Sequence, residues 1–112
     1  MFLEAPRDVG YSRGSPHQKG GYNDTATAVD NADALKVFFD RFPEFKHREF
    51  FITGESYAGV YVPTLAAELI RRFKNKQMLD VNLVGLAIGN GLISYRSQIN
   101  SIIDMFYYRG FY

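Results

Sequence analysis

Residues 50–63 read FFITGESYAGVYVP, and this stretch decides the fold. It opens with an apolar run over 50–53 that follows a charged turn, a pattern that predicts a fully buried strand. A sharp turn is expected over 54–59. An amphipathic helix is then predicted over 61–75, with Pro63 in its first turn. A strand, a tight turn and a helix in this order lift the side chain on the turn above the end of the strand.

Ser56 lies on this turn and is surrounded by small residues. Gly54 precedes it by two positions, and Ala58 and Gly59 follow it by two and three. This is the layout of a nucleophile elbow, although Ala58 stands where the general pattern has glycine. Ser56 Oγ would then be exposed, and the backbone N–H of Tyr57 would point at a developing oxyanion. The residues alone leave a second interpretation open, in which Ser56 caps a helix after a glycine turn.

Outward from the turn, hydrophobic spacing predicts alternating strands and helices. The end of a buried strand is expected over 1–6, a long polar loop over 7–24, a helix over 27–42, a strand over 83–88 and a helix over 97–108. Thr27 offers a capping-box-like start to its helix, and Pro43 ends that helix. Such alternation predicts an α/β fold in which parallel strands carry helices on their faces.

Composition excludes several classes of function. The 112 residues carry a net charge of +1 and are 46% apolar and 16% aromatic, which argues against disorder and gives no reason to expect a nucleic-acid or membrane partner. No apolar run has the length of a membrane span, and no signal peptide is visible. Without cysteine, and with His17 and His47 in no metal-ligand motif, neither a metal site nor any cofactor is expected.

Four stretches together resemble the serine carboxypeptidase family. The segment GESYAGVYVP over 54–63 resembles the family's signature. Residues 2–12 resemble the family segment upstream of the nucleophile, residues 30–43 the helix before it, and residues 85–92 the strand and loop after it. These stretches follow one another in family order and at family spacing over nearly the whole chain.

The resemblance implies an α/β-hydrolase fold and the removal of C-terminal residues from peptides through an acyl-enzyme. Ser56 would be the nucleophile, the Tyr57 N–H one oxyanion donor, and Glu55 one of two glutamates that bind the C-terminal carboxylate of the substrate. A glutamate beside a carboxylate must be protonated, because two negative charges repel each other. Such sites work best in acid, which suits the family's lysosomal, vacuolar and secreted settings.

The pattern of the family is incomplete in these residues. A hydrolase of this fold supplies Ser, then Asp or Glu, then His, but both histidines precede Ser56. Asp80 and Asp104 follow Ser56 without matching the triad position. The Gly-Gly-Pro-Gly segment and the second glutamate are absent too. Residues 1–112 are therefore expected to be a central fragment of the domain, unstable and inactive on its own.

Other interpretations remain open from the sequence. An acyltransferase of the same family would share Glu55 and Ser56, and a non-catalytic remnant that binds peptides or a partner protein would explain the missing histidine. Exposed sheet edges would favour self-association. The sequon at Asn23 is a possible glycosylation site in the loop, and the same residues would also suit the entry to a helix.

Overall fold

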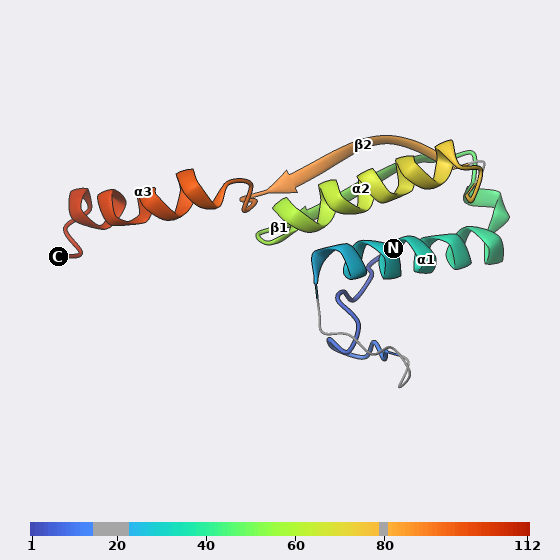
Figure 1. Cartoon of the computed structure of the whole chain (residues 1–112), viewed down its shortest axis with the longest axis horizontal. Helices are drawn as coiled ribbons and strands as arrows, with labels where there is room; N and C mark the ends of the chain where they lie inside the picture. Colours follow the sequence, from blue (N-terminus) through green and yellow to red (C-terminus); the bar gives the residue numbers. More distant parts are fainter. Residues whose placement is uncertain (15–22, 79–80) are drawn as a thin grey trace.

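The computed structural model describes residues 1–14, 23–78 and 81–112. The elements follow one another along the chain as α1 (Asp24–Arg41), the short 3-10 helix η1 (Pro43–Phe45), β1 (Glu49–Glu55), α2 (Ala58–Lys74), β2 (Asn82–Gly89) and α3 (Tyr95–Tyr108) (Figure 1). Helix, strand, helix, strand, helix is the alternation that the sequence predicts for an α/β fold.

β1 and β2 form a parallel two-stranded sheet. Glu49 pairs with Asn82 and Glu55 with Gly89, with one irregularity in register after Phe50. Parallel strands need a crossover, and α2 supplies it. Both strands therefore end at the same edge of the sheet, where the turn that holds Ser56 begins.

Residues 1–6 do not form the strand that their apolar character predicts. They have no regular secondary structure, and the Phe2 side chain is fully exposed. A strand exists only where a neighbour completes its ladder of hydrogen bonds. Within the described residues, β1 and β2 pair only with each other, so apolar character alone was an insufficient signal.

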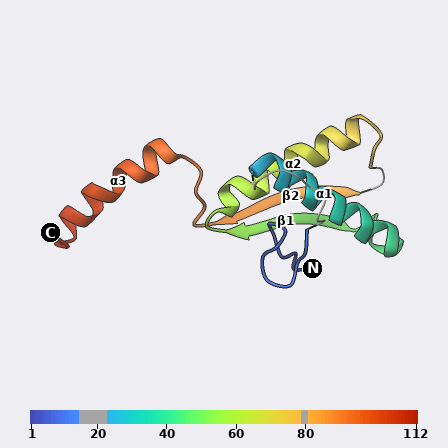
Figure 2. The same ribbon diagram turned by 60° about the horizontal axis from the view of Figure 1, so that its bottom comes forward.

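The core lies between the two long helices and one face of the sheet (Figure 2). α1 contributes Ala32 and Leu35, and α2 contributes Leu69, all nearly inaccessible to solvent. On the other face of the sheet, Phe51 and Val84 remain about half exposed. The prediction of a fully buried strand over 50–53 is therefore wrong for one face, because α1 and α2 cover only the other.

α1 begins at a different residue from the one predicted. Asn23 is its N-cap, and the side-chain oxygen of Asn23 accepts a hydrogen bond from the Ala26 N–H at 2.8 Å. Thr27, the predicted start, is buried inside the helix, and its hydroxyl donates to the Asn23 carbonyl at 3.0 Å. The helix ends before Pro43, as predicted, because proline disfavours a helical residue in front of it.

α2 begins three residues earlier than predicted, so that Pro63 lies inside the helix rather than in its first turn. At the other end of α2, Arg72 is buried rather than solvated. Its guanidinium contacts Glu68 at 2.7 Å and Asp33 of α1 at 2.6 Å. A charged side chain is rarely buried unless it is paired, and this pairing joins the two helices that form the core.

α3 stands apart from the rest of the chain, beyond the carboxyl ends of the strands (Figure 1). Among the described residues it packs against no other helix or strand, and its predicted apolar face is exposed, with Ile103 at 65% of its full accessibility. Across the described ranges, no helix combines the length and the apolarity needed to cross a bilayer.

Candidate active site

Ser56 occupies a strained backbone position at the end of the sheet. Its φ is +60°, in the left-handed region that non-glycine residues rarely adopt. It follows Glu55, the last residue of β1, and its N–H extends the ladder by donating to the Gly89 carbonyl at 3.0 Å. Ser56 is exposed. The N-cap of α2 is Tyr57, whose side chain makes no capping hydrogen bond, so the alternative in which Ser56 caps the helix is wrong.

The glycines around Ser56 allow the strand and the helix to approach. A Cβ on Gly54 would lie 2.4 Å from the Cβ of Ala58. A Cβ on Gly59 would lie 2.4 Å from the carbonyl oxygen of Leu92, in the loop after β2. Neither position can accept a side chain without movement of its neighbours. The turn is therefore packed on both sides, by its own helix and by that loop.

The peptide unit that joins Ser56 to Tyr57 is fixed in direction. The Ser56 carbonyl accepts hydrogen bonds from the Gly59 N–H at 3.0 Å and from the Leu92 N–H at 2.8 Å. In a trans peptide the C=O and N–H point in opposite directions. The Tyr57 N–H therefore points away from these two donors, and the first amides of a helix have no acceptor within the helix. A negative charge near Ser56 would meet this amide and the positive end of α2.

The Tyr57 side chain connects the turn to the start of α1. Its hydroxyl donates to both carboxylate oxygens of Asp24 at 3.3 Å, and its ring meets that of Tyr61 edge-on, with centroids 4.9 Å apart. A hydrogen bond with Tyr95, burial and the charge of Asp24 raise the pKa of Tyr57 to about 12. Sequence reasoning missed Asp24 and Tyr95 because no motif links residues so far apart along the chain.

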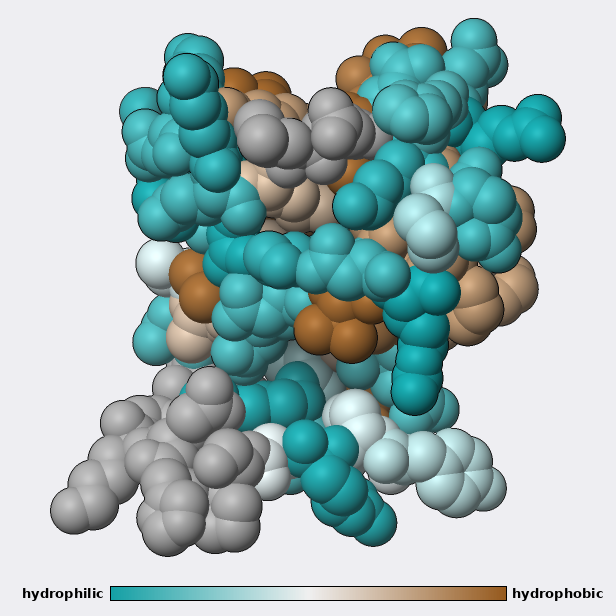
Figure 3. Space-filling view, turned by 90° about the vertical axis from the view of Figure 1, so that its right-hand side faces the viewer, coloured by the Kyte–Doolittle hydropathy of each residue, from teal (hydrophilic) through white to brown (hydrophobic). Residues whose placement is uncertain are grey.

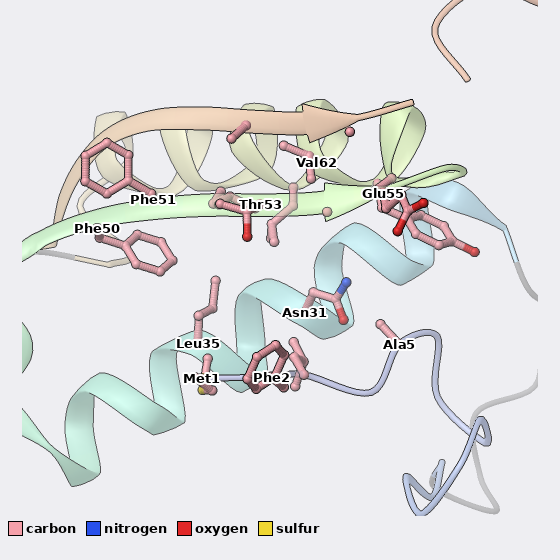
Figure 4. A pocket seen from close by; sticks show the side chains of 18 residues that line it. Met1, Phe2, Ala5, Asn31, Leu35, Phe50, Phe51, Thr53, Glu55 and Val62 are labelled. Atoms are coloured by element: carbon pink, nitrogen blue, oxygen red, sulfur yellow. The ribbon is translucent and has the colours of Figure 1, made fainter. Parts of the chain in front are cut away.

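Glu55 lies at the rim of a cavity of about 660 Å³ between β1, α1 and the N-terminal residues. Figure 4 shows Phe50 and Thr53 of β1 pointing toward this cavity, with Leu35 of α1 and Met1 on its far side. Glu55 itself is exposed. Glu55 and Ser56 are thus consecutive residues at the carboxyl end of β1, and Glu55 lies beside an apolar hollow.

His47, which precedes β1, lies far from Ser56. His47 is exposed and precedes β1, and a strand rises by about 3.3 Å per residue, which places His47 roughly 25 Å from Ser56. Figure 3 views this far end of the molecule, whose surface is mostly hydrophilic. Asp104 is exposed on α3. His17 and Asp80 lie outside the described residues. Among the residues that are described, no cluster of His, Asp or Glu could hold a metal ion.

Asn23 is exposed at the start of α1. Its Oδ1 is used by the helix cap, whereas a glycan is carried by the side-chain nitrogen. The cap and a glycan therefore use different atoms of the same side chain.

Comparisons with known proteins agree with one another. The sequence model of the serine carboxypeptidase family matches residues 1–112. The mouse lysosomal protective protein is 46% identical over 110 residues, covering 98% of this chain and 22% of its own length. Serine carboxypeptidase ctsa-4.1 of Caenorhabditis elegans is 43% identical over 108 residues, covering 96% of this chain and 22% of its own length. The crystal structure of Kex1(delta)p, a prohormone-processing carboxypeptidase from Saccharomyces cerevisiae, superposes with a TM-score of 0.80 at 27% identity, over 97% of this chain and 24% of its own. The chain thus spans about a fifth of the length of the curated relatives it matches.

Proposed function

The chain belongs to the serine carboxypeptidase family, and on that premise we propose that the protein removes C-terminal residues from peptides, with Ser56 as its nucleophile. Ser56 Oγ attacks the carbonyl carbon of the last peptide bond, and the amino acid that follows leaves with a proton on its nitrogen. Water then hydrolyses the ester and restores the Ser56 hydroxyl.

One observation carries this proposal more than any other. The Ser56–Tyr57 peptide is held by two hydrogen bonds to its carbonyl, from Gly59 and Leu92, at a position where φ is +60°. A non-glycine residue at positive φ costs conformational free energy, and it persists only where surrounding contacts, here the two hydrogen bonds, hold it in place. It supports the role of the Tyr57 N–H as an oxyanion donor, since a donor aids catalysis when its direction is set before the charge develops.

Glu55 is proposed to bind the C-terminal carboxylate of the substrate. It neighbours Ser56 at the exposed end of β1 and lies on the rim of the cavity. A glutamate in this role binds as the protonated acid, which donates a hydrogen bond to the carboxylate.

The general base is proposed to come from outside these 112 residues. Both histidines precede Ser56, and His47 lies at the opposite end of β1. The chain matches only 22% of the length of its mouse relative. This share supports the proposal that residues 1–112 form the elbow region of a larger α/β-hydrolase domain, with the remaining triad residues elsewhere in it.

A lysosomal or secreted location is also part of the proposal. The name of the mouse relative places that protein in the lysosome, and the exposed sequon at Asn23 is suited to an N-glycan.

The experiment compares two forms of one peptide, with a free C-terminal carboxylate and with a C-terminal amide, using the whole protein and its Ser56→Ala variant. The free acid should be cleaved at its last bond, the amide should be cleaved far more slowly, and Ser56→Ala should lose about 10⁴-fold or more in kcat. A fluorophosphonate probe should label the protein at Ser56 alone. Equal cleavage by Ser56→Ala would refute the assignment of the nucleophile, and transfer of the acyl group to an added alcohol in preference to water would identify an acyltransferase instead.

A further inference from the structure

The side chain of Gln98 makes three hydrogen bonds to the backbone of the loop between β2 and α3. Its Oε1 accepts from the Ile93 N–H at 2.6 Å and from the Ser94 N–H at 2.8 Å, and its Nε2 donates to the Gly91 carbonyl at 2.9 Å. The side chain therefore bridges the two ends of residues 91–94. Both its acceptor and its donor group are used, so that the loop is held from both sides of Leu92.

The same loop holds the turn at Ser56. The Leu92 N–H donates to the Ser56 carbonyl at 2.8 Å. A Cβ on Gly59 would lie within 2.6 Å of three backbone atoms of Leu92, and a Cβ on Gly91 would lie 3.2 Å from the Gly59 Cα. Loop and turn are in direct contact, and a displacement of Leu92 would remove one of the two hydrogen bonds that hold the Ser56 carbonyl.

Among the described residues, α3 makes one further contact with the turn, the hydrogen bond between Tyr95 and Tyr57, and it involves the Tyr57 side chain rather than the loop 91–94. α3 packs against no other helix or strand, so the loop is not held in place by the burial of the helix that follows it. Helix capping alone accounts for part of the arrangement, because Ser94 Oγ accepts from the Ser97 N–H at 3.2 Å. It does not account for the bond from Gln98 Nε2 to Gly91, which lies outside the helix and beside the turn.

We propose that Gln98 is a positioning residue for catalysis: through the loop 91–94 and the Leu92 N–H, it sets the direction of the Tyr57 amide that binds the oxyanion. This inference rests on the proposed function of Ser56 and adds a residue to its machinery. Gln98 touches neither the substrate nor the reacting atoms. It acts through the Ser56 carbonyl, which belongs to the same peptide plane as the Tyr57 N–H.

The proposal predicts different effects on kcat and on KM. The oxyanion forms only as the bond to Ser56 Oγ forms, so a misdirected Tyr57 amide lowers kcat and leaves the ground-state binding of substrate unchanged. Loss of one oxyanion donor costs about 100- to 1,000-fold in kcat. A donor that is displaced rather than removed should cost less, and we expect a loss of about 10- to 100-fold with an unchanged KM.

The test uses the whole protein with Gln98→Met, which keeps the length of the side chain and removes its three hydrogen bonds. Gln77→Met is the matched control, because Gln77 accepts a hydrogen bond from Arg71 at 3.3 Å beyond the far end of α2. Peptide cleavage gives kcat and KM, and the rate of labelling by a fluorophosphonate reports the reactivity of Ser56 directly. We expect Gln98→Met to be slow in both assays at unchanged KM, and Gln77→Met to match the wild type.

The outcomes distinguish this inference from the proposed function. A wild-type protein that neither reacts with the probe nor cleaves peptides overturns the proposed function, and this inference with it. A reactive wild type together with an equally reactive Gln98→Met variant overturns the inference alone, as does a loss that appears only in KM. Should Gln98→Met fail to fold, Gln98→Glu decides, because it keeps the two acceptor bonds and loses the donor to Gly91. A reduced kcat at unchanged KM in that variant supports the inference, and wild-type rates overturn it.

Discussion

Replacing Gly59 by alanine should disrupt the turn that carries Ser56. The added methyl group would lie 2.4 Å from the Leu92 carbonyl oxygen and 2.6 Å from the Leu92 nitrogen, where ordinary contacts begin at 3.4 Å. The loop must therefore retreat by about 1 Å. Because these atoms belong to the backbone, no change of side-chain rotamer can relieve the contact. The same retreat lengthens the 2.8 Å hydrogen bond from the Leu92 N–H to the Ser56 carbonyl.

The cost of Gly59→Ala can be worked from these terms. Overpacking costs about 1–3 kcal/mol, and the lost hydrogen bond costs about 0.5–1.5 kcal/mol. Alanine is favoured over glycine in a helix by roughly 0.5–1 kcal/mol, which offsets part of this. The free energy of unfolding should therefore fall by about 2 kcal/mol. Because the Ser56–Tyr57 peptide loses one of its two anchors, the labelling of Ser56 by a fluorophosphonate should slow as well.

The assay is urea unfolding of the whole protein, with Gly89→Ala as the matched control. A Cβ on Gly89 would have the Glu55 Cγ at 3.8 Å and the Gly54 carbonyl oxygen at 3.9 Å as its nearest neighbours, which are ordinary contacts. Gly89→Ala should therefore change the free energy of unfolding by no more than roughly 0.5 kcal/mol. Equal stability of the Gly59→Ala and Gly89→Ala variants would refute the close-packing argument.

Substitutions in two further regions test the ion pairs of Glu68 and the cap and sequon at Asn23. A hydrogen bond from Arg71, supported by Arg72, lowers the pKa of Glu68 from 4.5 to about 2. This stabilisation is complete above pH 4.5 and is lost as the pH falls toward 2. In urea unfolding, Glu68→Gln should therefore be less stable than the wild type by about 1–3 kcal/mol at pH 7, and the two proteins should converge near pH 2. An equal difference at both pH values would contradict the ion pairing. For Asn23, secretory expression of Asn23→Gln should lose both a glycan, seen as reduced mass, and about 0.5–2 kcal/mol of cap stability. Thr25→Ala should lose the glycan and keep the cap, and an unchanged mass in both variants would show the sequon to be unused.

The sequence predicted the elements well and their ends less well. Alternating apolar spacing located both helices of the core, the two strands and α3. The errors arose where a contact with another part of the chain decides the local structure. Asn23 rather than Thr27 caps α1 because its side chain reaches the Ala26 N–H. Residues 1–6 are apolar enough for a strand, yet they join no ladder within the described chain.

In the candidate site, too, the sequence determines some features and only the fold determines others. GESYAG determines by itself that Ser56 lies on a strained turn, since the small residues at 54 and 58 permit an approach of strand and helix that larger ones would block. Such steric limits are local, so the sequence contains them. The tertiary structure alone decided that Leu92 anchors the Ser56 carbonyl and that Asp24 receives the Tyr57 hydroxyl. These contacts join residues more than thirty positions apart, and only the folding of the chain brings them within hydrogen-bonding distance.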